Sequence, residues 1–156
     1  MTENLLQPGT IVADKYRIVR PLGQGGMGTV YLVQHVKTDE RLAMKVLNAA
    51  VVNSPAARER FRREARTPAR IDSDHVARVV DSDIASALGD APFIVMEYLK
   101  GRDLQALSDE AGPLPPKEVI TYLRQTARAL DKAHRMGIVH RDLKPENLFL
   151  VKRDDG

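Results

Sequence analysis

The chain has 156 residues, with 24 Lys and Arg, 21 Asp and Glu and a formal net charge of +3. It contains no cysteine, which excludes disulfides and thiolate metal sites. The nearly balanced charge does not by itself indicate a nucleic-acid-binding protein. No apolar run approaches the roughly 20 residues of a transmembrane helix, and residues 1–10 lack the pattern of a secretory signal. These features favour a cytoplasmic protein of one compact domain or two small lobes.

The first half of the sequence predicts an antiparallel sheet. Segments 16–23, 29–36 and 41–47 are rich in β-branched and aromatic residues, and short polar or glycine-rich stretches separate them. Connections this short predict consecutive antiparallel hairpins. A further pair of strands is predicted at 76–85 and 92–99, joined by a turn.

An arginine-rich helix is predicted between these two groups of strands. Ser54 is expected at its N-cap and Pro55 at its first helical position. Segment 57–70 then carries six arginines and two glutamates. A solvent-exposed helix face is the favoured interpretation of such mixed charge. A nucleic-acid-binding strip is the alternative, although Phe61 is the one aromatic residue among the arginines.

The second half of the sequence predicts helices. Segment 101–116 favours a short helix that Asp103 caps and Gly112 ends. A long helix is predicted from Pro116, with Gly137 just beyond its last turn. Val119, Leu123, Thr126 or Ala127, Leu130 and His134 recur at intervals of three and four and form one face of this helix. If no further helix covers this face, Leu123 and Leu130 stay exposed and form an apolar patch.

A glycine cluster separates the first two predicted strands. Gly23, Gly25 and Gly28 have the spacing G-x-G-x-x-G, which is a weak signal when it stands alone. A strand follows the cluster directly, so the glycines are expected in a hairpin. Glycines there would let backbone N–H groups approach phosphates closely. An ordinary loose turn is the alternative.

Lys45 lies within the third predicted strand. Alternation along a strand places it on the same face as Ala43 and Leu47. A lysine among inward-facing apolar side chains is costly without an anionic partner. That partner could be a phosphate or Glu64 of the following helix, and an exposed strand lysine is the alternative.

The segment H-R-D-L-K-P-E-N, 140–147, concentrates polar residues between the long helix and a strand-like run. Asp142 could accept a proton from a hydroxyl. Lys144 could neutralise the charge of a transferring phosphate, and Asn147 could offer an amide oxygen to Mg²⁺. A polar loop with helix-capping residues is the alternative.

These three motifs, in this order, resemble the signature of a protein kinase catalytic domain of the bacterial serine/threonine type. The resemblance extends from about Tyr16 to the end of the chain. It implies an α+β, protein-kinase-like fold, in which an antiparallel N-lobe sheet with one main helix precedes an incomplete, mainly helical C-lobe. The implied organisation is an extension at 1–15, a nucleotide-binding N-lobe at 16–97, and the start of a C-lobe at 98–156.

The resemblance also implies an ATP site. The glycine-rich loop would cover the nucleotide, and Lys45 would hold the α- and β-phosphates in an ion pair with Glu64. In the segment M-E-Y-L, Met96 would be the gatekeeper, while the Glu97 carbonyl and the Leu99 amide would bond the adenine. The residues implied in cofactor binding are Leu22, Gly23, Gln24, Gly25, Gly26, Met27, Gly28, Thr29, Val30, Ala43, Lys45, Glu64, Met96, Glu97, Leu99 and Asp103.

In the same family pattern Asp142 would be the catalytic base, Lys144 would contact the γ-phosphate, and Asn147 would bind Mg²⁺. Arg141 would pair with a phosphate on the activation loop. Small-molecule phosphotransferases of the antibiotic type usually lack R-D-L-K-P-E-N. The resemblance therefore favours a protein substrate with a Ser or Thr hydroxyl, and no nucleic-acid partner is expected.

The sequence departs from the family pattern in two places. The 156 residues contain neither D-F-G nor A-P-E, so we expect a fragment of a kinase that is inactive alone. A catalytically dead ATP-binding or interaction module is the alternative. Pro68 removes the N–H that would bond the Glu64 carbonyl, so the helix is expected to kink or end there. Whether Glu64 reaches Lys45 is thereby left open.

Overall fold

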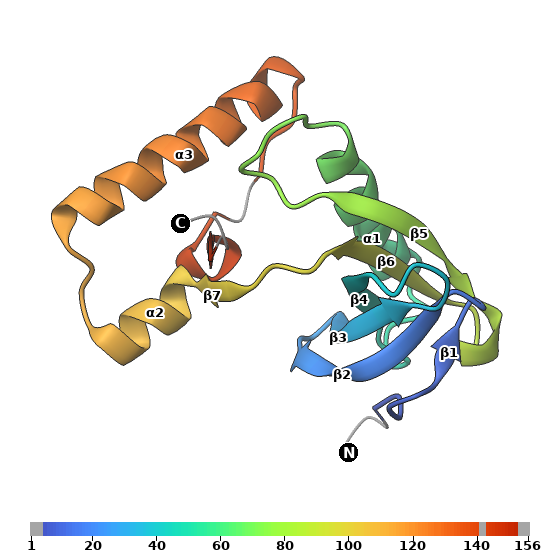
Figure 1. Ribbon diagram of the computed structural model, residues 1–156. Coiled ribbons are helices and arrows are strands. Elements are labelled where there is room, and N and C mark those ends of the chain that lie inside the picture. Colours follow the sequence, from blue (N-terminus) through green and yellow to red (C-terminus); the bar gives the residue numbers. More distant parts are fainter. Residues whose placement is uncertain (1–4, 141–142, 153–156) are drawn as a thin grey trace. The chain divides into compact units, whose positions relative to one another are not determined.

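The structure is a computed structural model that describes residues 5–140 and 143–152. These residues fall into two compact units (Figure 1). The first holds the residues up to Arg70 together with Ala77–Tyr98. The second holds Ile71–Val76 and the residues from Leu99 onward.

The first unit is built on a six-stranded antiparallel sheet with the strand order β1-β2-β3-β4-β6-β5. The predicted strands are confirmed. Strand β1, which pairs with β2, was not predicted, because two residues carry no alternation that could reveal it. A short 3-10 helix, Ser86–Leu88, connects β5 to β6. The strands are β1 (Ile11–Val12), β2 (Tyr16–Gln24), β3 (Gly28–His35), β4 (Arg41–Leu47), β5 (Val79–Ala85) and β6 (Ala91–Glu97).

Helix α1 (Pro55–Ala69) begins as the sequence predicts. The Ser54 hydroxyl accepts a hydrogen bond from the Ala57 N–H at 3.3 Å, and Pro55 occupies the first turn. The helix continues through Pro68 and ends one residue later, at Ala69. Pro68 therefore acts only on the last turn, where the N–H group that it lacks removes a single hydrogen bond from the helix.

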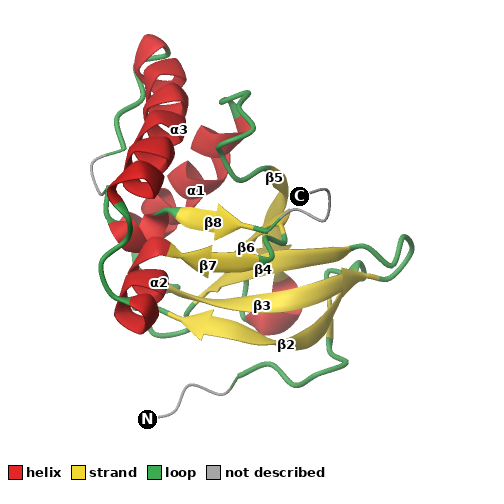
Figure 2. Cartoon of the chain, turned by 60° about the vertical axis from the view of Figure 1, so that its left-hand side comes forward, coloured by secondary structure: helices red, strands yellow, loops and turns green. Residues whose placement is uncertain are grey.

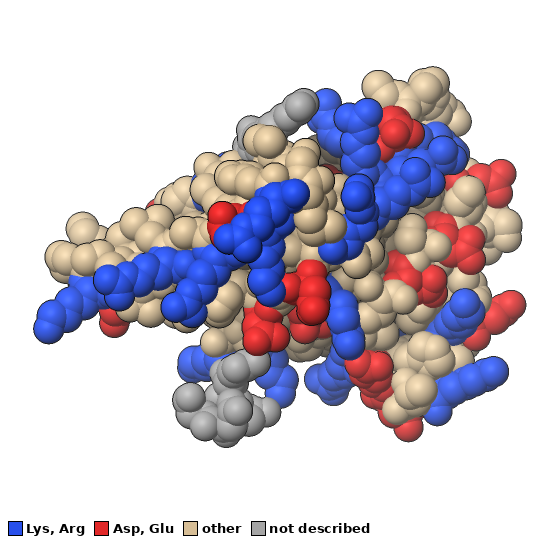
Figure 3. All heavy atoms as spheres, turned by 90° about the horizontal axis from the view of Figure 1, so that it is seen from above, with Lys and Arg blue, Asp and Glu red and all other residues tan. Residues whose placement is uncertain are grey.

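The arginines of α1 point mainly to solvent, which confirms the favoured interpretation of segment 57–70. Arg58 is the exception, since its guanidinium donates to the carbonyls of Val52 and Asp90. Figure 3 shows Lys and Arg side chains interspersed with Asp and Glu on the face that it displays.

The two faces of the sheet have separate apolar cores. On one face Tyr16, Met44 and Phe93 belong to a large buried cluster. On the other face Phe61 and Ala65 of α1 pack with Leu47 and Ile94. Side chains alternate along β4, so Leu42, Met44 and Val46 join the first cluster while Leu47 joins the second. Burial of a phenylalanine stabilises a fold by about 1.5–3 kcal/mol, and the Phe61 contacts therefore fix α1 on the sheet.

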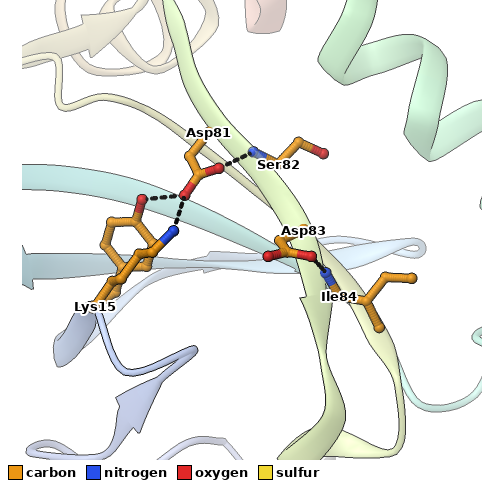
Figure 4. A network of polar contacts seen from close by, with 6 residues as sticks. Lys15, Asp81, Ser82, Asp83 and Ile84 are labelled. Carbon is orange, nitrogen blue, oxygen red and sulfur yellow. Dashed lines mark hydrogen bonds and ion pairs between the residues drawn. The ribbon is translucent and has the colours of Figure 1, made fainter.

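A polar contact connects β2 with β5 across the curled sheet. The Tyr16 hydroxyl donates to Asp81 Oδ2 at 2.5 Å, and Lys15 Nζ lies 3.8 Å from the same oxygen (Figure 4). In the strand order three strands separate β2 from β5, so this bond shows that the sheet closes partly on itself. Burial raises the pKa of Tyr16 well above its usual value, and the hydrogen bond to Asp81 adds to that shift.

The second unit contains two helices and a short strand pair (Figure 2). Helices α2 (Leu104–Ala111) and α3 (Pro116–Arg135) follow the sequence prediction closely. Asp103 caps α2 as predicted, since its Oδ1 accepts from the Ala106 N–H at 2.8 Å. Strand β7 (Gly101–Asp103) was not predicted, and it pairs antiparallel with β8 (Phe149–Val151).

The apolar face of α3 is only partly covered in the second unit, as the sequence allows. Leu123 is 57% exposed and His134 is exposed as well. The buried positions are Ala129 and Ala133, which lie on a neighbouring stripe of the helix. Residues on two neighbouring stripes of a helix both recur at intervals of three and four, so the spacing alone does not show which stripe is buried. Alanines give only a weak hydropathy signal, although their small size lets them pack close to a neighbour.

The end of α3 forms the glycine cap that the sequence predicts. Gly137 has a φ of 76°, its N–H donates to the His134 carbonyl, and the Ile138 N–H donates to the Ala133 carbonyl. These two bonds define a Schellman motif. Across the described part of the chain, no helix combines the length and the apolar character that crossing a bilayer requires.

We expect Tyr16→Phe to lower the free energy of unfolding by about 1–2 kcal/mol near neutral pH, because the Asp81 carboxylate loses a buried donor. Urea denaturation measures this change. Because the pKa of Tyr16 is raised in the folded state, its contribution is present below about pH 10 and is lost as the pH rises further. Tyr16→Phe should remove that alkaline loss.

Asp83→Asn is the matched control for Tyr16→Phe. The Asp83 carboxylate accepts only a local bond from the Ile84 N–H among the hydrogen bonds that the structure records for it, and an amide oxygen can replace it. If Asp83→Asn lowers the free energy of unfolding as much as Tyr16→Phe does, the hydrogen bond between β2 and β5 contributes no more to stability than a local bond.

Candidate functional site

The glycine cluster forms the hairpin that the sequence predicts. Gly23 pairs with Val30 and Gln24 with Thr29, at the adjoining ends of β2 and β3. The turn is closed by a hydrogen bond of 2.9 Å from the Gly25 N–H to the Gly28 carbonyl. The cluster therefore does not introduce a helix, as it would in a dinucleotide-binding fold.

The glycines of this loop are not equivalent. A Cβ on Gly28 would lie 2.7 Å from the Val46 carbonyl oxygen and 3.2 Å from Lys45 Cε. At Gly23 and Gly26 a Cβ would meet nothing within 4 Å. Packing within the chain thus requires glycine at position 28, whereas Gly23 and Gly26 leave open space beside the backbone, where an anion could approach it.

Lys45 and Glu64 form an ion pair with an Nζ–Oε2 distance of 2.7 Å. The side chains are 23% and 41% exposed, so the pair lies at a surface that solvent reaches. Lys45 Nζ also lies 6.0 Å from the centroid of the Phe61 ring. Because α1 is helical from Pro55 through position 64, Pro68 does not prevent the contact.

Apolar residues surround Lys45 on the sheet. Val30 lies opposite Lys45 in the register of β3 and β4, and Ala43 is buried on the same strand. Leu22 is partly exposed on β2. Met96 of β6 packs against the apolar cluster of α1. These residues supply an apolar surface beside a cation, as a nucleotide base next to its phosphates would need.

Glu97 is held by the segment that precedes β5. Its N–H donates to the Arg78 carbonyl at 2.9 Å, and its carboxylate accepts from the Arg78 N–H at 2.8 Å. Leu99, two residues later, belongs to the second unit.

In the second unit the β7–β8 pair brings together two predicted site segments. Asp103 pairs with Phe149, and the Leu104 N–H donates to the Leu148 carbonyl at 2.8 Å. Asn147 directly precedes this pair, in a 3-10 turn at Pro145–Asn147. The sequence gives no local sign of this proximity, since the segments are more than forty residues apart.

Lys144 opens that 3-10 turn. Its carbonyl accepts from the Asn147 N–H at 2.9 Å, and its Nζ lies 3.7 Å from Glu146 Oε2. The side chain is 46% exposed. Arg141 and Asp142, which the sequence predicts as part of the same site, lie outside the described residues.

Residues 16–155 match the family described as protein kinase domain. The chain belongs to this family. It is 40% identical over 153 residues to the serine/threonine-protein kinase pkn2 of Myxococcus xanthus, covering 97% of this chain and 18% of that protein. It is 43% identical over 139 residues to Pkn1 of the same organism, covering 89% and 19%. The crystal structure of the Mycobacterium tuberculosis PknI kinase domain matches with a TM-score of 0.79 and 36% identity, covering 95% of this chain and 60% of that one.

This family membership confirms the resemblance to protein kinases that the three sequence motifs indicate. The relatives named above are serine/threonine-protein kinases. The chain spans about a fifth of the length of these curated relatives.

Asn147 is the predicted oxygen ligand for Mg²⁺, and Mg²⁺ usually takes one or two carboxylates together with substrate phosphates. Residues 5–140 and 143–152 contain no group of three His, Asp or Glu side chains that could hold a metal. Asn147 therefore fits a metal that bound phosphates help to retain, and the described residues do not form a metal site without them.

Sequence reasoning missed one residue beside the glycine-rich loop of this kinase. Asn48 follows β4 directly and makes three hydrogen bonds to Gly25, Met27 and Thr29. No motif marks this asparagine, because its partners lie about twenty residues away and meet it only in the folded sheet.

We expect Gly28→Ala to destabilise this kinase chain by about 1–3 kcal/mol, because the added Cβ would force the loop away from the Val46 carbonyl. Gly26→Ala is the matched control and should change stability by less than about 0.5 kcal/mol. Thermal and urea denaturation of both variants measure the difference. Equal stability of the two variants would contradict the packing requirement at Gly28.

Proposed function

We propose that the chain is the nucleotide-binding lobe and catalytic loop of an ATP- and Mg²⁺-dependent protein serine/threonine kinase. The observation that carries the proposal is the ion pair between Lys45 of β4 and Glu64 of α1, with an Nζ–Oε2 distance of 2.7 Å, together with the close packing of Gly28 against β4. A cation fixed beside a glycine hairpin is suited to bind the phosphates of a nucleotide. The names of the serine/threonine kinases to which the chain is similar support this assignment.

In the proposed complex the glycine-rich loop from Gly23 to Val30 covers ATP. Lys45 neutralises the α- and β-phosphates, and Glu64 keeps the lysine side chain oriented. Leu22 and Ala43 contact the adenine, together with Met96 at the back of the site. Backbone groups of Glu97 and Leu99 bond its polar edge, and Asp103 binds the ribose.

The transfer step is assigned to the segment 140–147. Asp142 accepts the proton of a Ser or Thr hydroxyl as that oxygen attacks the γ-phosphorus and the bond to ADP breaks. Lys144 balances charge on the transferred phosphoryl group. Asn147 supplies one ligand to Mg²⁺, which neutralises the phosphates when bound. Positioning and charge neutralisation account for most of the rate enhancement in this chemistry.

Asp142→Asn tests the proposed function in a polypeptide that continues this chain through an Asp-Phe-Gly segment. We expect phosphate incorporation into a Ser/Thr-containing protein such as casein to fall by about 10²–10⁴-fold, since the general base is lost. ATP affinity, measured by calorimetry, should change little. Asp131→Asn on α3 is the control, because Asp131 pairs only with the exposed Arg135 on its own helix among the recorded ion pairs. Incorporation that survives Asp142→Asn would overturn the role of this residue.

The 156 residues alone should bind ATP but transfer phosphate far more slowly than the roughly 1–100 turnovers per second of ordinary protein kinases. The physical reason is that no Asp-Phe-Gly aspartate is available in them to hold Mg²⁺ across the β- and γ-phosphates. A radiolabelled-ATP transfer assay measures the rate. Turnover at ordinary rates would show that this aspartate is dispensable.

A further inference from the structure

Asn48 fastens the tip of the glycine-rich loop to the end of β4. Its backbone N–H donates to the Met27 carbonyl at 2.7 Å, and its side-chain Nδ2 donates to the Gly25 carbonyl at 2.9 Å. Its Oδ1 accepts from the Thr29 hydroxyl at 3.1 Å. One residue thus holds both sides of the turn and the first residues of β3.

Thr29 and the Gly25 carbonyl together hold the Asn48 amide in one orientation. Thr29 is 4% exposed, so its hydroxyl lies in a buried position. The Gly25 carbonyl can only accept, so Nδ2 faces it, and the Thr29 hydroxyl then donates to Oδ1. A reversed amide would set its oxygen against that carbonyl oxygen, and two acceptors repel each other. Leaving a buried hydroxyl without a partner costs about 1–3 kcal/mol, which keeps the arrangement in place.

Met27 joins the same tip to α1. Its side chain is partly buried against the cluster that contains Leu47 and Phe61. Arg60 of α1 places a guanidinium nitrogen 3.8 Å from the Met27 sulfur. The tip of the loop therefore packs against α1, the helix that contains Glu64.

The bonds of Asn48 determine where the loop N–H groups point. In a trans peptide the C=O and the following N–H point in opposite directions. Because Asn48 binds the Gly25 and Met27 carbonyls, the N–H groups of Gly26 and Gly28 are turned away from it. A loop with this orientation presents two backbone donors on the side away from Asn48, and backbone N–H groups of this kind bind anions.

We propose that Asn48 is a positioning residue for the phosphates of the bound nucleotide. It acts through the glycine-rich loop and does not contact the nucleotide itself. Removing its side chain should leave the adenine contacts in place while the Gly26 N–H loses its fixed direction. The inference rests on the proposed ATP site, and it assigns part of the phosphate affinity to a residue outside the G-x-G-x-x-G motif.

The test compares ATP, ADP and adenosine binding to the 156-residue chain and its variants by calorimetry. Asn48→Ala should weaken ATP and ADP by about tenfold, roughly the effect of one hydrogen bond, and adenosine by less than about twofold. Asn53→Ala is the matched control, because Asn53 is an exposed asparagine in the turn that precedes α1. It should bind all three ligands as the unchanged chain does.

Thr29 provides a second, independent pair of variants in case Asn48→Ala does not fold. Thr29→Val removes the hydroxyl that orients the amide and should also weaken ATP more than adenosine. Thr29→Ser keeps the hydroxyl and should restore the affinity. The double variant of Asn48→Ala and Thr29→Val should bind ATP no more weakly than Asn48→Ala alone, since both changes break one network.

The outcomes separate the inference from the proposed function. If the unchanged chain does not bind ATP, the proposed function fails and the inference fails with it. If the unchanged chain binds ATP and both Asn48→Ala and Thr29→Val bind it equally well, only the role of Asn48 is overturned. An equal loss of ATP and adenosine affinity would also overturn it, because the residue would then support the fold rather than the phosphate site.

Discussion

The contact of α1 with the sheet through Phe61 is the interaction on which the first unit depends. Phe61 is buried with Leu47 and Ile94, and its burial is worth about 1.5–3 kcal/mol. The Lys45–Glu64 pair is partly exposed, and exposed ion pairs typically contribute about 0–1 kcal/mol. The apolar contact is thus the stronger of the two interactions. It places the helix, and the ion pair forms because Glu64 is carried to Lys45 by a helix that is already fixed.

This order of effects explains why a charged pair can serve binding. A lysine held only by its ion pair would lose its position whenever a phosphate competed for it. Here the stem of Lys45 passes close to Gly28 and its Nζ lies 6.0 Å from the centroid of the Phe61 ring, so the position of its ammonium group does not depend on Glu64 alone. The loop side is fixed in the same way, by the close approach of Gly28 to Val46 and by the bonds of Asn48. Lysine and loop are therefore arranged before any ligand binds, which lowers the entropy that binding must overcome.

Much of this arrangement could be predicted from the sequence, because local patterns encode it. The bounds of β4, the Ser54 cap, the Gly137 cap and the glycine hairpin each follow from residues adjacent in the chain. Strand β1, strand β7 and the Asn48 contacts could not be predicted, because each depends on a partner distant in sequence. The burial of Ala129 and Ala133 on α3 could not be predicted for a related reason: the spacing of three and four fits two neighbouring stripes, and only packing shows which of them is covered. The predicted end of the helix near Pro68 is confirmed to within one residue, and only the position of Glu64, earlier in the helix, was left open by the sequence.

In the second unit, as in the first, a glycine allows two strands to approach each other closely. Gly101 of β7 has a φ of 149°, and a Cβ there would collide with the Leu150 carbonyl oxygen, so the two strands approach as they do only because position 101 has no side chain. That approach sets Asp103 opposite Phe149 and places the turn of Asn147 at the start of the pair. In the first unit Gly28 allows β3 to approach Val46 and so places the loop beside Lys45. In both units a glycine, by lacking a side chain, permits two backbones to meet, and the polar residues next to it take their positions from that contact.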